Sequence, residues 1–206
     1  MKSDDRIVFG AIGGAAAAAA VFTVLAGALR LTPDTPVFWY LSRSSGLMAY
    51  SLLWMSTVAG LLMSSRARLL PGRTAMELHK MTSGTALAFA LFHGLVLSGD
   101  RYMNWNLADL LLPLATSYKP FWLSAGQLSL TFSAALLASS ALRQSLGNKA
   151  WRALHYLAFL SYWLALAHAM AMGRDAGHPL IAGFYTLTGA VTLWLTTARI
   201  WVREGS

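Results

Sequence analysis

The stretch from residue 75 to residue 97, with the sequence AMELHKMTSGTALAFALFHGLVL, decides the fold of this chain. It is long enough to cross the hydrocarbon core of a bilayer as a helix, for which about 20 residues suffice. Apart from Glu77 and Lys80 near its start, its only ionisable side chains are His79 and His93. The stretch therefore predicts a transmembrane helix that carries two histidines at membrane depth.

The rest of the chain has the same apolar character. Of its 206 residues, 56% are hydrophobic and only 12% are charged, whereas soluble domains carry about 25% charged residues. No linker divides the sequence, so we expect one membrane domain over residues 1–206. The predicted fold is all-α, a bundle of six transmembrane helices at about 7–29, 45–64, 75–97, 121–142, 149–172 and 179–200, with an interfacial segment at about 105–112.

Local signals place several helix ends. Thr74 and Glu77 have the spacing of a capping box, in which the Thr hydroxyl and the Glu carboxylate bond the first free backbone N–H groups. Gly173 follows the fifth apolar stretch, where glycine commonly ends a helix. Pro179 is placed to begin the sixth helix, because proline suits the first helical turn.

The first apolar stretch could also be read as a secretory signal peptide. The triplet Ala26-Gly27-Ala28 resembles a cleavage site. The apolar run of about 7–29 is nevertheless long enough to span a bilayer. We therefore expect a first transmembrane helix there.

The basic residues predict the orientation of the bundle. The net charge is +8, and the 16 lysines and arginines lie between apolar stretches, so topology explains them better than nucleic-acid binding does. With both termini in the cytoplasm, the cytoplasmic side holds eleven of them and the other side five. We expect an integral protein of a bacterial inner membrane with cytoplasmic N- and C-termini.

The absence of cysteine limits the chemistry. Disulfides, thiolate-bound zinc, iron–sulfur clusters and covalently attached c-type haem all need cysteine. The chain has none. Any metal must therefore be bound by histidine, carboxylate or methionine.

Four of the five histidines fall within predicted transmembrane helices. His79 and His93 lie fourteen residues apart, about 21 Å along one helix and within about 40° of one face. His155 and His168 lie thirteen apart on the fifth helix, about 20 Å along its axis. Parallel helices would pair His79 with His155 and His93 with His168.

The second pair does not share a face of an ideal helix. Thirteen residues leave His155 and His168 about 220° apart. Either the fifth helix is locally tightened or kinked, or the two side chains approach their metals from different sides. The sequence does not choose between these alternatives.

Two histidines at each level favour haem over a bare ion. Zinc would lack two of its four ligands, whereas haem supplies four equatorial nitrogens and needs only one or two axial ligands. Ionisable groups inside a membrane are by default functional. We predict His79, His155, His93 and His168 as axial ligands of non-covalent haem b, with two haems per chain.

The histidine spacing, together with residues 79–101, 113–120 and 151–173, resembles the ferric reductase transmembrane superfamily. That group includes ferric reductases, NADPH oxidases and the haem membrane subunit of the bacterial methionine sulfoxide reductase system. The resemblance covers nearly the whole chain. It implies two stacked haems, with His79/His155 at the cytoplasmic level and His93/His168 at the outer level, passing electrons singly from a cytoplasmic flavin across the membrane.

The sequence contains no strand, glycine-rich turn and helix in the order that binds a flavin or nicotinamide. We therefore expect a separate flavoprotein or quinol to donate electrons, and no catalytic residue on this chain. Two alternatives remain open. The chain could be the haem subunit of a two-component periplasmic reductase, or a non-redox structural subunit of a larger membrane complex whose histidines only form hydrogen bonds.

Haem propionates are anionic and favour basic partners. Basic residues near the two levels are candidates for that role, and setting the topology is their alternative role. They are Arg73, Lys80, Lys149 and Arg152 on the expected cytoplasmic side, and Arg101 and Arg174 on the other.

Overall fold

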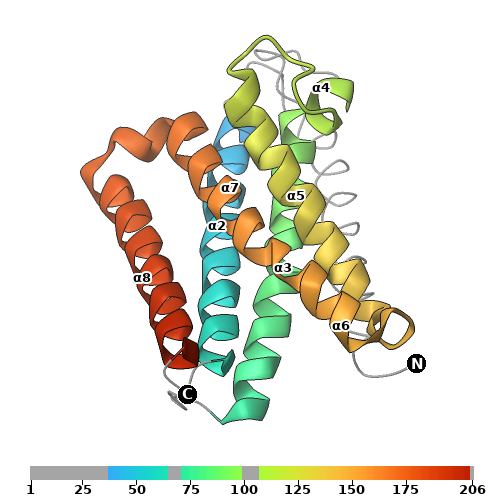
Figure 1. Cartoon of the computed structure of the whole chain (residues 1–206). Coiled ribbons are helices and arrows are strands. Elements are labelled where there is room, and N and C mark those ends of the chain that lie inside the picture. Colours follow the sequence, from blue (N-terminus) through green and yellow to red (C-terminus); the bar gives the residue numbers. More distant parts are fainter. Residues whose placement is uncertain (1–36, 65–70, 99–106, 205–206) are drawn as a thin grey trace.

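The computed structural model describes residues 37–64, 71–98 and 107–204. The helices in this part of the chain are α2 (Val37–Ser64), α3 (Gly72–Leu97), α4 (Leu107–Leu111), α5 (Pro120–Ala141), α6 (Arg143–His155), α7 (Leu157–Met172), the 3₁₀ turn η1 (Arg174–Gly177) and α8 (Pro179–Glu204). Figure 1 shows the long helices side by side, with α4 at one end of the bundle and α6 at the other. The predicted helix at 7–29 and Arg101 lie outside the described residues.

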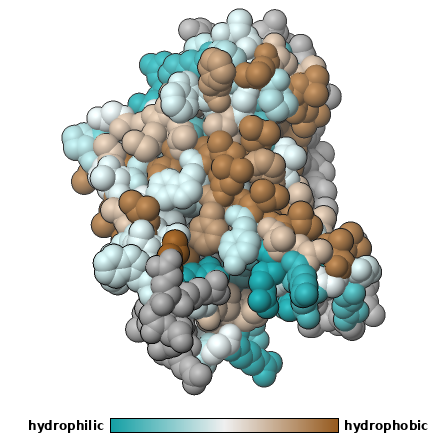
Figure 2. Space-filling model, in the orientation of Figure 1, coloured by the Kyte–Doolittle hydropathy of each residue, from teal (hydrophilic) through white to brown (hydrophobic). Residues whose placement is uncertain are grey.

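Five helical segments of the described chain are long and apolar enough to span a membrane. They are Val37–Ser64, Gly72–Leu97, Pro120–Ala141, Arg143–Met172 and Pro179–Trp201. Figure 2 shows hydrophobic side chains across the middle of one face and hydrophilic ones towards its ends, the pattern of a protein embedded in lipid. The all-α fold and the membrane-spanning character are confirmed at this level.

The start of the third predicted helix agrees with the sequence to within a few residues, but its capping does not. The helix Gly72–Leu97 starts after Pro71, and no side chain caps it. The predicted capping box is therefore wrong: Thr74 already lies inside the first turn. Glu77 instead accepts a hydrogen bond from Arg73 Nε at 3.1 Å, a pairing one turn apart on the same exposed face.

Two helices are longer than predicted, and other helix ends lie where the sequence places them. Helix α2 is helical from Val37 rather than from about residue 45, and α8 continues to Glu204 rather than to about residue 200. Gly173 follows the end of α7 and Pro179 opens α8, as the sequence indicates. The short α4 lies within the predicted interfacial segment at 105–112.

The helical segment Arg143–Met172, which contains the predicted fifth span, is interrupted twice. Gly147 has a φ of 76°, which glycine adopts without steric cost, and it breaks the helix before the apolar part begins. At Tyr156 the backbone N–H bonds the Ala153 carbonyl, and the Tyr156 carbonyl accepts from Phe159 N at 3.1 Å. These i to i+3 bonds tighten the turn directly after His155, by about 20° for each residue relative to an α-helix.

A tightened helix is the first of the two alternatives that the histidine spacing leaves open. Because His155 is the last residue of α6 and His168 lies on α7, the tightened turn falls between them. It reduces the mismatch in the directions of the two side chains.

Buried hydroxyl groups join the helices at the core. Tyr50 of α2 bonds Thr188 of α8 at 2.5 Å and lies 3.3 Å from the hydroxyl of Tyr162 on α7. On the other side of the bundle, Ser161 of α7 bonds the Ser129 carbonyl of α5 at 3.0 Å. Satisfying polar groups within the bundle is required where no water is available, so these contacts fix α2, α5, α7 and α8 against one another.

An ion pair ties α2 to the connection between α7 and α8. Arg43 Nε donates to Asp175 Oδ2 at 2.7 Å, a second nitrogen bonds Oδ1, and the guanidinium lies 3.9 Å from the centre of the Trp39 ring. Asp175 belongs to η1, outside the membrane-spanning segments. The hydrogen bond from Arg43 holds the pKa of this carboxyl below its ordinary value of 3.8.

A lowered folded-state pKa makes the contribution of this ion pair depend on pH. The stabilisation is complete above the unfolded pKa of Asp175 and is lost as the pH falls through the folded pKa. We expect Asp175→Asn to lower the melting temperature of the detergent-solubilised protein at about pH 6, with the difference from wild type disappearing as the pH falls through the lowered pKa of Asp175. Glu77→Gln, which removes an exposed pair within one helix, is the control and should change little. Equal melting temperatures of wild type and Asp175→Asn at pH 6 would contradict this assignment.

Candidate metal centre

The structure brings the four membrane histidines together in the pairs that their spacing predicts. His79 of α3 faces His155 of α6, with ring centroids 6.1 Å apart. His93 of α3 faces His168 of α7, with ring centroids 6.3 Å apart. We name the first the α6-end pair and the second the α4-end pair, after the short helices at the two ends of the bundle in Figure 1.

These separations suit one metal ion held between two imidazoles. Imidazole nitrogens bind metals at about 2.0–2.1 Å, and because each nitrogen lies roughly 1.1 Å from its ring centroid, a shared metal needs centroids about 6.3 Å apart. Both observed distances lie close to that value. All four side chains are partly buried. The centroid separations leave room for one metal ion between the two rings at each level.

Hydrogen bonds orient three of the four rings through Nδ1. His79 Nδ1 lies 2.9 Å from the Ser56 carbonyl and His93 Nδ1 lies 2.8 Å from the Ser42 carbonyl, both on α2. His168 Nδ1 lies 2.8 Å from the Trp122 carbonyl on α5. A carbonyl only accepts, so Nδ1 carries the proton in each case and Nε2 keeps its lone pair for a metal. Metal-binding histidines are oriented in this way in most metalloproteins.

The hydroxyls of the same two serines lie beside the rings as well. Ser56 Oγ is 3.0 Å from His79 Nδ1, and Ser42 Oγ is 3.3 Å from His93 Nδ1. Both serines are buried in α2. The α3 histidines are thus directed by matching residues of one neighbouring helix.

His155 is held differently. Its Nδ1 is buried and has no hydrogen-bond partner among the described residues. Its ring instead stacks on Trp151, one turn earlier, with centroids 4.9 Å apart and planes 27° from parallel. Trp151 is fixed in turn by Ser140, which lies 3.4 Å from its Nε1, and by the Arg143 guanidinium, 4.2 Å from its ring centroid.

Glycines leave room for three of the rings. A Cβ atom at Gly126 would lie 2.6 Å from His168 Nδ1, and one at Gly46 would lie 3.1 Å from the His93 ring. At Gly60 the corresponding distance to His79 is 3.4 Å, an ordinary contact. At Gly126 and Gly46, α5 and α2 can therefore approach the His168 and His93 rings closely only because these two positions lack a side chain.

Sequence reasoning missed these supporting residues, although a signal exists. Gly46 and Gly60 are fourteen residues apart on α2, as are Ser42 and Ser56, and this is also the spacing of His79 and His93. Since α2 and α3 run in opposite directions, each glycine and each serine meets one histidine. A search for equal spacings on neighbouring predicted helices would have found them.

The described residues contain no group of three or more His, Asp or Glu side chains able to hold a metal ion. Each level offers two imidazoles only. A bare zinc site would need about four protein ligands or three and a water. The donor set therefore fits a group that brings its own equatorial ligands, as haem does.

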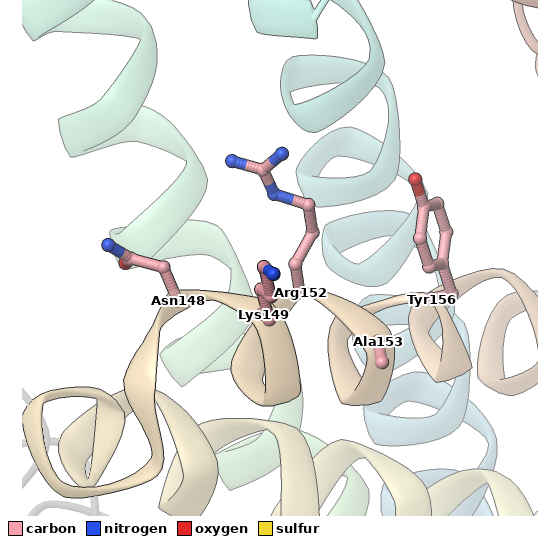
Figure 3. Close-up of a pocket in the computed structure, with 5 residues that line it drawn as sticks. All are labelled: Asn148, Lys149, Arg152, Ala153 and Tyr156. Atoms are coloured by element: carbon pink, nitrogen blue, oxygen red, sulfur yellow. The ribbon is translucent and has the colours of Figure 1, made fainter.

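The basic candidates have different surroundings. Lys149 and Arg152 line one pocket of about 410 Å³ on α6 together with Asn148, Ala153 and Tyr156. Figure 3 shows the first four of these residues along α6 and Tyr156 beyond its end, with Arg152 and Tyr156 extending to the same side. These two cations are thus brought together near the α6-end pair.

The remaining basic candidates are not gathered there. Arg73 is exposed and pairs with Glu77, and Arg174 is exposed in η1. Lys80 is partly buried on α3, one residue after His79. Arg101 lies outside the described residues. Propionate binding by any of these residues stays a prediction.

Comparisons with models of known protein families, with curated proteins and with solved structures found no match to this chain. The class of protein that the fold defines is an all-helical membrane protein with two opposed histidine pairs. A more particular assignment therefore depends on the chemistry of the site.

The glycine beside His168 provides a direct test of the α4-end pair. We expect Gly126→Ala to displace the His168 ring, because the new Cβ would lie well inside contact distance. Haem affinity at that level should fall by about 10–100-fold, as for other changes to groups that orient metal ligands. The measurement is haem content per chain after purification with limiting haem.

Gly183→Ala on α8 is the matched control, because a Cβ there meets nothing within 4 Å. Alanine is favoured over glycine in a helix by roughly 0.5–1 kcal/mol, so this variant should be at least as stable as wild type. Full haem content in Gly126→Ala would contradict the close approach of α5 to His168.

Proposed function

We propose that this chain is a di-haem b electron carrier of the ferric reductase-like type that conducts electrons across a membrane. The observation that carries the proposal is the pair of opposed imidazoles at each of two levels, 6.1 and 6.3 Å between ring centroids. His79 and His155 would hold one haem, and His93 and His168 the other. Haem b, when bound, supplies a one-electron couple between ferric and ferrous iron.

The pairing of the histidines favours electron transfer over chemistry on a bound substrate. With two histidines holding each haem, the group would supply one-electron transfer rather than a binding position for oxygen or another small ligand. The chain's part is then to hold the rings rigidly and to exclude water. The hydrogen bonds from Nδ1 of His79, His93 and His168 to helix carbonyls provide that rigidity.

The separation of the two levels suits conduction through a bilayer. Fourteen residues of α3 between His79 and His93 correspond to about 21 Å, within a hydrocarbon core of about 30 Å. One level therefore lies towards each surface. With both termini in the cytoplasm, as the basic residues predict, the α6-end pair faces the cytoplasm and a separate flavoprotein or quinol supplies electrons.

The non-redox alternative explains less of the geometry. Histidines that serve only as hydrogen-bonding groups have no reason to face one another in two pairs at metal-binding distance. Among the described residues, no hydrogen bond is formed by Nε2 of any of the four rings, while Nδ1 of three is used. A nitrogen kept free on each ring is what axial ligation requires.

Two bound haems per chain are the expected result when the protein is expressed with sufficient haem. The purified protein should give a haem b spectrum that changes on addition of dithionite. His93→Ala should remove one haem and leave the other, because only the α4-end pair loses a ligand. The pyridine haemochrome assay counts haem against protein.

His178→Ala is the control for this experiment. His178 lies between η1 and α8, and the one hydrogen bond described for its side chain is accepted from Leu180 N at 3.4 Å. Both haems should be retained in this variant. Haem-replete wild-type protein without porphyrin would overturn the proposed function.

A further inference from the structure

The two histidine pairs differ in the way their rings are oriented. In the α4-end pair, both Nδ1 atoms face carbonyls, of Ser42 and Trp122, at 2.8 Å. In the α6-end pair, only His79 has such a partner, while Nδ1 of His155 has none among the described residues. What this difference means for electron transfer rests on the proposed function.

The local fold explains why His155 lacks a carbonyl partner. His155 is the last residue of α6, a helix in which no residue is fully buried. Each of the other three rings contacts α2 or α5, where a carbonyl faces its Nδ1 atom, and glycines admit two of these rings closely. His155 instead lies at the tightened turn at Tyr156, and the contact that orients its ring comes from its own helix.

That contact is Trp151, which is itself held in place. Its indole contacts both the His155 ring, with centroids 4.9 Å apart, and the Arg143 guanidinium, 4.2 Å from the indole ring centroid. Arg143 also donates to Asn148 Oδ1 at 3.1 and 3.2 Å, across the break at Gly147. Stacking thus replaces the missing hydrogen bond as the constraint on this ligand.

We propose that Trp151 is the positioning residue of His155, and that the α6-end pair forms the haem site with the higher reduction potential. A hydrogen bond from Nδ1–H to a carbonyl raises the basicity of a ligating imidazole. A more basic ligand stabilises ferric iron over ferrous iron and lowers the potential. The α4-end site has two such ligands and the α6-end site has one, so an electron rests preferentially at the α6 end.

The first experiment compares the two sites separately. His93→Ala leaves the α6-end site and His79→Ala leaves the α4-end site, each in the full chain. In each variant, the midpoint potential of the remaining haem is measured by potentiometric titration, with the optical band of the haem as the signal. We expect the higher midpoint potential in His93→Ala. An equal or lower midpoint in His93→Ala would overturn the inference while leaving the proposed function intact.

The second experiment tests Trp151 itself. In Trp151→Leu, the midpoint potential and the low-spin ferric EPR signal of the α6-end haem should shift, while those of the α4-end haem stay unchanged. Trp151→Phe, which keeps an aromatic ring, should restore most of the wild-type signal. Trp194→Leu, at an exposed position of α8, is the matched control and should alter neither haem.

The outcomes separate the two proposals. A shift of both haems, or of neither with haem retained, would show that Trp151 does not position His155. Trp151→Leu that fails to fold leaves the comparison of His93→Ala with His79→Ala as the deciding measurement. Wild-type protein that binds no porphyrin would instead overturn the proposed function, and this inference with it.

Discussion

The bundle depends on how closely α2 approaches α3. Two hydrogen bonds from His79 and His93 to carbonyls of α2 fix the register of these antiparallel helices over most of their length. The approach is tight enough that a Cβ at Gly46 would crowd the His93 ring. Because a buried imidazole without a partner is costly in a membrane, the same contacts stabilise the helix pair and orient the rings.

The remaining helices act as a frame around that pair. Tyr50 connects α2 to Thr188 of α8 and to Tyr162 of α7, while Ser129 and Ser161 connect α5 to α7. Each contact joins hydroxyls or carbonyls that water cannot reach inside a bilayer. Rigid placement of α7 relative to α2 and α3 is what brings His168 opposite His93.

Because of the break between α6 and α7, the rings of the two histidine pairs are oriented by different contacts. A continuous α-helix would direct His155 and His168 about 220° apart. The tightened turn at Tyr156 lessens that divergence, and it leaves His155 at a helix end, away from a carbonyl partner. The departure from regular helix thus lies beside the proposed metal ligand, where Trp151 takes over its orientation.

The sequence by itself determined the helical membrane fold, most helix ends and the partners of all four histidines, because hydrophobic length and residue spacing are local properties of a helix. It did not determine the capping of α3, the acceptors at Ser42, Ser56 and Trp122, or the need for glycine at position 126. Every residue has a carbonyl, so which one meets an imidazole depends on the register and closeness of two helices. Only the tertiary structure sets those, and with them the difference between the two histidine pairs.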